Sequence, residues 1–93
     1  ILQTLSRTLH EEVAFDRSRV TSVDWASYPI LGFAEVPQIR VAIVNRPHEP
    51  PLGAGEASAT PVPAALANAV FDAVGARITT VPLTRQRVLA ALG

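Results

Sequence analysis

The chain has 93 residues, with eight arginines, no lysine and eight acidic residues, so its formal net charge at pH 7 is zero, and 48% of the residues are hydrophobic. This size allows one small domain, and the neutral, apolar composition excludes a disordered chain and a basic arm for a nucleic-acid partner. The absence of cysteine excludes a disulfide scaffold, a cysteine-ligated zinc or iron–sulfur site and a thiol nucleophile.

The first half of the chain predicts one helix and three strands. Three leucines at helical spacing predict a helix over residues 1–10: Leu2, Leu5 and Leu9. Alternating apolar residues at 13–15 and 20–23, joined by the polar turn 16–19, predict a hairpin. Residues 38–44 alternate on two faces and are rich in β-branched side chains, which predicts the clearest strand of a half-covered antiparallel sheet.

The second half predicts a loop, two helices and a short strand. Prolines and glycines over residues 45–55 exclude helix and central strand there. Thr60 and Pro61 predict a helix start, and Gly75 predicts its end. We expect this helix to bury an apolar stripe: Leu66, Val70, Phe71 and Val74. A strand over 77–81 and a helix capped by Thr84 follow, so the order of elements predicts an α+β fold, a small antiparallel sheet with packed helices.

The beginning of the chain has no typical helix start. The chain contains no methionine, and the apolar helical pattern begins at Ile1 without a preceding Ser, Thr, Asp or Asn. We therefore expect a C-terminal fragment of a longer polypeptide, although a trimmed or disordered beginning would give the same pattern.

The stretch from Pro50 to Glu56 is the best candidate for chemistry. Two prolines stiffen it, and Gly53 and Gly55 let the backbone pass close to a ligand. The carboxylate of Glu56 follows, and an acid in an apolar loop suits a general base because burial raises its pKa. The alternative is a plain turn whose Glu56 lies near the positive end of the next helix.

Other site types find less support. A phosphate-binding P-loop needs a lysine, and Ser58 stands where a dinucleotide fingerprint needs its third glycine. Ser27 and Ser58 have no evident base, so a hydrolase triad is unsupported.

The stretch Pro50–Glu56, followed by Pro63–Gly75, resembles the C-terminal end of the molybdopterin-binding large subunit of the xanthine dehydrogenase and aldehyde oxidoreductase family. Further segments are similar, in the same order: Ile1–Ser6, Tyr28–Leu31, Glu35–Pro37 and Val81–Thr84. The resemblance covers essentially the whole chain and is strongest to the bacterial branch that includes isoquinoline 1-oxidoreductase and the nicotinate dehydrogenase large subunit. One departure is Ala57, where many relatives have proline after the glutamate.

The resemblance implies that residues 1–93 are a C-terminal fragment of the family's second molybdenum-binding domain. Such enzymes hydroxylate an aldehyde or an N-heterocycle with oxygen from water. By position, Glu56 would be the general base at the molybdenum centre, and the backbone of Gly53, Ala54 and Gly55 would approach the cofactor. The full subunit would hold molybdopterin and a partner subunit or domain would hold iron–sulfur clusters, so we expect the isolated chain to bind neither, to provide no metal ligand and to be inactive.

The implied partners are the rest of the molybdenum-binding subunit, an iron–sulfur subunit, an electron-acceptor subunit and a small aldehyde or N-heterocycle substrate. Relatives are found in the bacterial cytoplasm or are exported to the periplasm or the membrane, so the resemblance leaves the compartment open. The alternative is a stand-alone α+β interaction or dimerisation module without catalysis, in which the apolar first helix is a docking face. In either case we expect the exposed apolar face to favour self-association of the chain.

Overall fold

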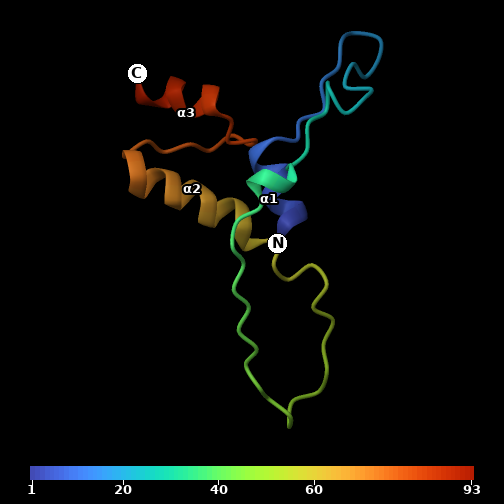
Figure 1. The fold of residues 1–93 in the computed structure, drawn as a ribbon, viewed down its shortest axis with the longest axis vertical. Helices are drawn as coiled ribbons and strands as arrows, with labels where there is room; N and C mark the ends of the chain where they lie inside the picture. The colour runs from blue at the N-terminus through green and yellow to red at the C-terminus, as the bar shows by residue number, and fades with distance from the viewer.

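Three helices and one 3₁₀ turn make up the regular structure. The computed structural model describes all residues from Ile1 to Gly93, with α1 (Leu2–Leu9), the turn η1 (Phe33–Glu35), α2 (Pro61–Val74) and α3 (Arg85–Leu92). Figure 1 shows α1 at the centre, with α2 leading away from it. Residues 76–83 then return along α2 to α1 and lead into α3. No helix meets the length and hydropathy that a membrane crossing requires.

The three predicted helices are confirmed, because local signals define their ends. Pro61 occupies the first turn of α2, and Gly75 ends that helix with a φ of 73°, a left-handed conformation that favours glycine. The Thr84 side chain accepts a hydrogen bond from the Arg87 amide at 3.3 Å and so caps α3. By contrast, α1 has no side-chain cap, in agreement with its sequence.

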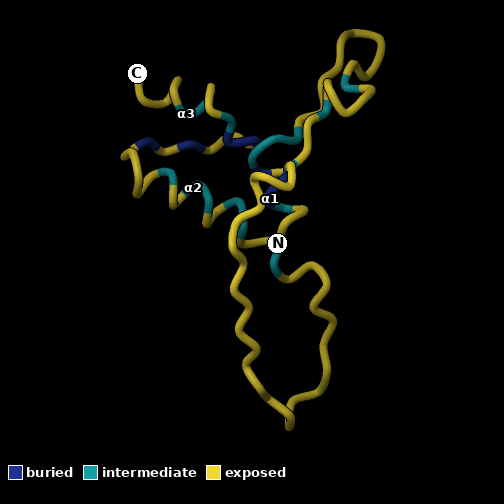
Figure 2. The backbone as a smooth tube through the Cα atoms, in the orientation of Figure 1, coloured by how far each residue is buried: buried dark blue, intermediate teal, exposed yellow.

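The core lies between α1 and the returning segment 76–83. Seven residues are buried, and all of them belong to these two parts of the chain: Leu5, Ser6, Thr8, Ala76, Ile78, Pro82 and Leu83. The Leu83 amide donates a hydrogen bond of 2.6 Å to the Thr8 carbonyl, which fixes the two segments side by side. Figure 2 shows how little of the backbone is buried away from this contact.

The predicted antiparallel sheet is not found, so the α+β fold class was wrong for this chain. The only pairing of β type is an isolated antiparallel bridge between Phe15 and Val20, at the predicted hairpin. Residues 38–44 and 77–81 form no strand. A strand requires a neighbour to satisfy its backbone N–H and C=O groups, and neither segment has one within the chain.

The predicted apolar stripe of α2 is present in the sequence but is not buried. Leu66 and Val70 are half-buried, whereas Phe71 and Val74 are exposed. α1, the returning segment and the start of the second loop lie against α2, and they leave its outer end uncovered (Figure 1). At that end the Arg77 guanidinium lies 3.8 Å from the centre of the Phe71 ring, a cation–π contact.

Two loops extend from the core in opposite directions (Figure 1). The first loop, residues 10–32, is fastened to α1 near its second end, where the Leu31 amide donates to Ser6 Oγ at 3.0 Å. Within the loop, the Tyr28 hydroxyl donates to Glu11 Oε2 at 2.8 Å. The second loop, residues 36–60, is attached by a side-chain hydrogen bond only near its end, where the amino group of Ile1 donates to Ser58 Oγ at 3.3 Å.

Two aspartates hold the turns of the first loop. Asp16 Oδ1 accepts hydrogen bonds from the Ser18 amide at 2.7 Å, from the Ser18 hydroxyl and from the Arg19 amide. Asp24 Oδ1 accepts from the hydroxyl and amide of Ser27, at 2.6 and 2.9 Å. These bonds favour the charged carboxylates and lower the pKa of both aspartates. The turns are therefore held by local polar contacts rather than by strand pairing.

The contact between Tyr28 and Glu11 predicts a pH effect. The Glu11 carboxylate raises the pKa of Tyr28 above its ordinary value, because the hydrogen bond favours the neutral phenol. A pKa raised by folding stabilises the fold at lower pH, and this contribution is lost as the pH rises through the raised value. Glu11→Ala is expected to lower the titration midpoint of Tyr28, the one tyrosine in the chain, as followed by its ultraviolet absorbance. Glu12→Ala is the control, and an equal midpoint in the two variants would contradict the contact.

The left-handed residue at the end of α2 gives a stability prediction. Gly75→Ala is expected to lower the free energy of unfolding by about 1 kcal/mol, because an alanine is strained at a positive φ. Gly53→Ala should leave it unchanged, since a Cβ atom there would have nothing within 4 Å. Urea unfolding of the two variants followed by circular dichroism measures both values. Equal effects would contradict the described backbone.

Candidate functional site

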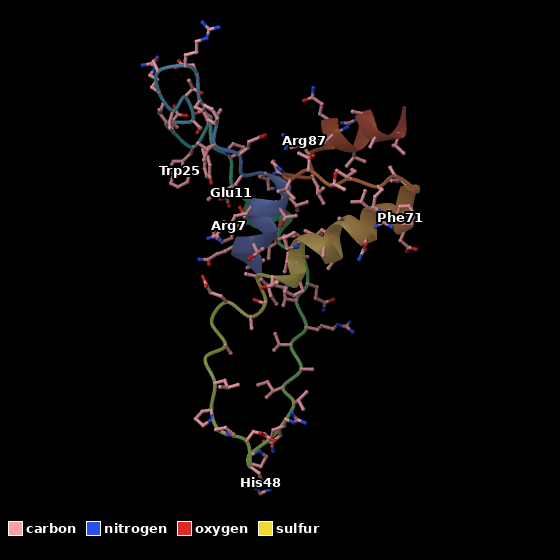
Figure 3. All side chains as sticks on the ribbon, turned by 180° about the vertical axis from the view of Figure 1, so that it is seen from behind. Arg7, Glu11, Trp25, His48, Phe71 and Arg87 are labelled. Carbon is pink, nitrogen blue, oxygen red and sulfur yellow. The ribbon has the colours of Figure 1, made fainter.

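The predicted site residues lie on the arm of the second loop that returns to α2. Every residue from Gly32 to Ala57 is exposed, and this stretch includes Gly53, Ala54, Gly55 and Glu56. In Figure 3, His48 marks the far end of the loop, well away from Arg7 and Glu11 on the side of α1. The predicted site therefore faces solvent within this chain.

Glu56 stands at the point where the loop turns toward α2. Its carbonyl accepts a hydrogen bond of 2.9 Å from the Ala59 amide and closes a turn that precedes the helix. Its carboxylate takes part in none of the side-chain hydrogen bonds or ion pairs of the structure. The acid is therefore held at its backbone and free at its side chain.

Gly53 and Gly55 leave open space beside the backbone and do not form an enclosed binding site. A Cβ atom built at either position would have no atom within 4 Å, and neither residue has a positive φ. The approach Pro50–Leu52 makes no hydrogen bond with the rest of the chain. The backbone beside Glu56 is thus accessible to a large group, and nothing in the chain encloses that group.

The fit to a molybdenum cofactor can be tested on these residues. No group of three or more His, Asp or Glu side chains gathers where it could hold a metal ion. The loop nevertheless fits a cofactor held elsewhere, because its backbone is accessible at two glycines and its carboxylate is unpaired. Such a cofactor would meet Glu56 and the backbone of residues 53–55 from outside this chain.

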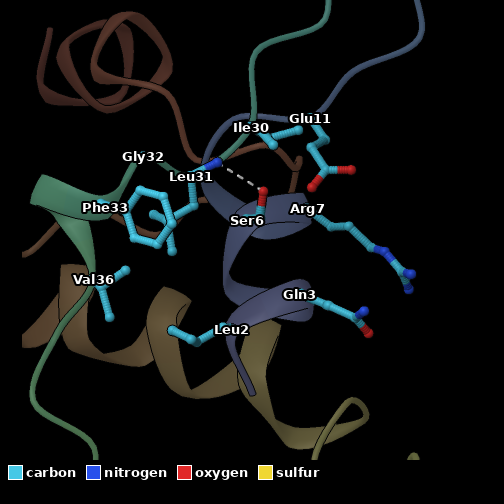
Figure 4. Close-up of a pocket in the computed structure, with 10 residues that line it drawn as sticks. All are labelled: Leu2, Gln3, Ser6, Arg7, Glu11, Ile30, Leu31, Gly32, Phe33 and Val36. Carbon is cyan, nitrogen blue, oxygen red and sulfur yellow. Dashed lines mark hydrogen bonds between the residues drawn. The ribbon is translucent and has the colours of Figure 1, made fainter. Parts of the chain in front are cut away.

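The largest cavity lies elsewhere, between α1 and residues 30–36. It is an open groove of about 600 Å³, shown in Figure 4, and none of its lining residues comes from the returning arm of the second loop. Its apolar lining consists of Leu2, Ile30, Leu31, Phe33 and Val36. Phe33 is fully exposed, so this groove has no cover within the chain.

The other side of the groove is polar. Gln3, Arg7 and Glu11 line it, and Figure 4 shows them pointing away from the apolar residues. Arg7 and Glu11 are four residues apart, and this spacing can be read directly from the sequence. No sequence pattern indicated the groove itself, because it depends on the contact of Ser6 with Leu31, 25 residues away. The structure does not bring this groove together with Glu56.

Comparison with known proteins finds a similar enzyme subunit. The chain is 50% identical, over all of its 93 residues, to a nicotinate dehydrogenase subunit of Pseudomonas putida strain KT2440. The chain spans 8% of the length of that protein, so the similarity is to a fragment of it. No protein-family model matches the chain, and no solved structure matches it. Because the identity extends through the second loop, the loop with Glu56 lies inside the matched region.

Proposed function

We propose that this chain is one part of the large subunit of a molybdenum hydroxylase, to which it contributes the loop with Glu56. The observation that carries the proposal is the unpaired carboxylate of Glu56 beside two accessible glycines, inside a region of whole-length identity to the nicotinate dehydrogenase subunit. Within the region of sequence identity, the motif Gly53–Glu56 provides a carboxylate that can act as a base and an accessible backbone next to it.

Glu56 acts as the general base in this proposal. When bound, the molybdenum cofactor supplies the redox chemistry that inserts a water-derived oxygen into the substrate. Glu56 accepts the proton released by the attacking oxygen, and its carboxylate is available for this because no residue of the chain already binds it. Proton removal of this kind typically contributes about 10²–10⁴-fold to a rate.

The backbone of the loop has a separate role. Without side chains at Gly53 and Gly55, the main chain would be open to the cofactor, while Ala54 adds only a methyl group. Pro50 and Pro51 restrict the approach and so limit how far Glu56 moves. The turn closed by the Ala59 amide fixes the backbone of Glu56 relative to the start of α2.

The rest of the subunit must complete the site. All residues from Gly32 to Ala57 are exposed, so exclusion of water from Glu56 depends on protein outside residues 1–93. We propose that this is the rest of a molybdenum-binding domain, and that the isolated chain is inactive. An iron–sulfur subunit and an electron acceptor take up the electrons. An N-heterocycle such as nicotinate is the favoured substrate class, and an aldehyde is the other.

A second candidate function is an interaction module without catalysis. The uncovered groove beside Phe33 favours it, since such a surface suits a protein partner. The groove also fits the first proposal, in which the same large subunit covers it. The two differ in whether Glu56 matters for a reaction.

Substitution of Glu56 tests the base. In the complete enzyme, Glu56→Gln is expected to lower kcat about 10²–10⁴-fold, because the amide cannot accept the proton at the reacting oxygen. The molybdenum content, measured by elemental analysis, should stay unchanged, since the glutamine keeps the size of the side chain.

Glu49→Gln is the matched control. Glu49 lies in the same loop, is equally exposed and forms no ion pair, so its substitution should leave kcat within about twofold. Wild-type kcat in Glu56→Gln would overturn the assignment of the base. A loss of molybdenum together with kcat would instead assign Glu56 a role in holding the cofactor.

A further inference from the structure

The outgoing arm of the second loop has no hydrogen-bond partner. Residues 37–45 neither donate nor accept any backbone or side-chain hydrogen bond within the chain. Residues 37–40 line a groove with α1 and α2, and beyond them Figure 1 shows the arm running out from the core without a neighbouring segment beside it. Its apolar side chains project into solvent, with Val41 75% and Ile43 89% exposed.

The composition of this arm is that of a strand and not of a loop. Four of the seven residues from Gln38 to Val44 are valine or isoleucine, and Arg40 is the only charged one. Ile39, Val41 and Ile43 share one face, and such alternation is typical of a strand that is covered on one side. Between Pro37 and Pro47 the arm contains no proline and no glycine. An exposed segment with free backbone groups and β-branched side chains is a template for pairing with the edge of a sheet.

We propose that Gln38–Val44 is a β-strand that adds to the edge of a sheet in the rest of the large subunit. This inference rests on the proposed function, in which residues 1–93 are one part of that subunit. The partner is therefore an exposed sheet edge, which supplies backbone N–H and C=O groups to the arm and an apolar surface to Ile39, Val41 and Ile43.

Two observations favour the large subunit as the source of that edge. The chain matches only 8% of the length of the nicotinate dehydrogenase subunit, so that relative has ample sequence to form a sheet. The arm and the loop with Glu56 also belong to one continuous exposed stretch, from Gly32 to Ala57. A body that encloses Glu56 therefore reaches the arm as well. Strand pairing would fix the arm and, through it, the position of the catalytic loop.

Amide hydrogen exchange in the native polypeptide that carries this chain tests the pairing. With mass spectrometry, about half of the amides in the peptide covering residues 39–44 are expected to exchange at least about 100-fold more slowly than their intrinsic rate, because a strand that adds to one edge pairs every second amide. Exchange of this peptide at the intrinsic rate would overturn the proposal. Protection that appears only in a homodimer of the 93-residue chain would assign the edge to a second copy and would also overturn it.

Proline substitutions provide a second readout. Successive N–H groups of a strand point to opposite edges, so Val41→Pro and Ala42→Pro each remove a donor from one edge. At least one of the two is expected to lower the yield of assembled subunit about tenfold or more. His48→Ala is the control, because His48 lies at the loop end outside the arm and its side chain makes no hydrogen bond. Wild-type yield in both arm variants would overturn the proposal.

These measurements test the proposed strand and the proposed general base independently of each other. Exchange protection reports on pairing whether or not the enzyme turns over, and Glu56→Gln leaves the arm intact. Protection of residues 39–44 with an active Glu56→Gln enzyme would retain the strand and reject the base. An unprotected arm with an inactive Glu56→Gln enzyme would do the reverse.

Discussion

The contact between α1 and residues 76–83 is the constraint on which the rest of the structure depends. Leu5, Ile78 and Leu83 are buried in these two segments, and the bond from the Leu83 amide to the Thr8 carbonyl joins the segments. α2 also contacts α1 directly, and α3 is tied to the first loop by the ion pair between Arg87 and Glu12, 2.7 Å apart. Everything between residues 10 and 60 extends from this small core as two loops. The bond from the Leu31 amide to Ser6 fastens the first loop to α1, whereas the second loop is tied only near its end, by the bond from the Ile1 amino group to Ser58.

The surface of the chain exposes apolar side chains of the kind that proteins usually bury in their interior. Phe33 is fully exposed, the groove beside it is uncovered, and β-branched residues of the arm 38–44 meet solvent. Each of these features is costly alone and becomes favourable when another surface covers it. The whole-length identity to 8% of a much longer relative gives these features one explanation. In the proposed enzyme the chain carries a catalytic loop, and the surfaces around that loop are those that dock it into a larger body.

Local structure could be predicted from the sequence. The ends of α2 and α3 follow from Pro61, Gly75 and Thr84, whose effects need only the next few residues. The arrangement of residues 38–44 could not be predicted in the same way, because strand pairing there depends on a partner that lies outside the chain. The groove was missed for a related reason, since it is formed by segments 25 residues apart. The role of Glu56 as a base was predicted from the family resemblance and stays a prediction, because the motif alone fits a plain turn as well and the carboxylate has no partner within the chain.

Molybdenum content is the most direct test of this account. The native polypeptide that carries the chain is purified from a host able to make the cofactor, and its molybdenum is measured by elemental analysis against protein concentration. About one molybdenum atom per polypeptide is expected, which is the stoichiometry of a resident catalytic cofactor. A folded preparation without molybdenum would contradict the account. The loop with Glu56 would then be only a turn before α2, and the interaction module would be the better explanation.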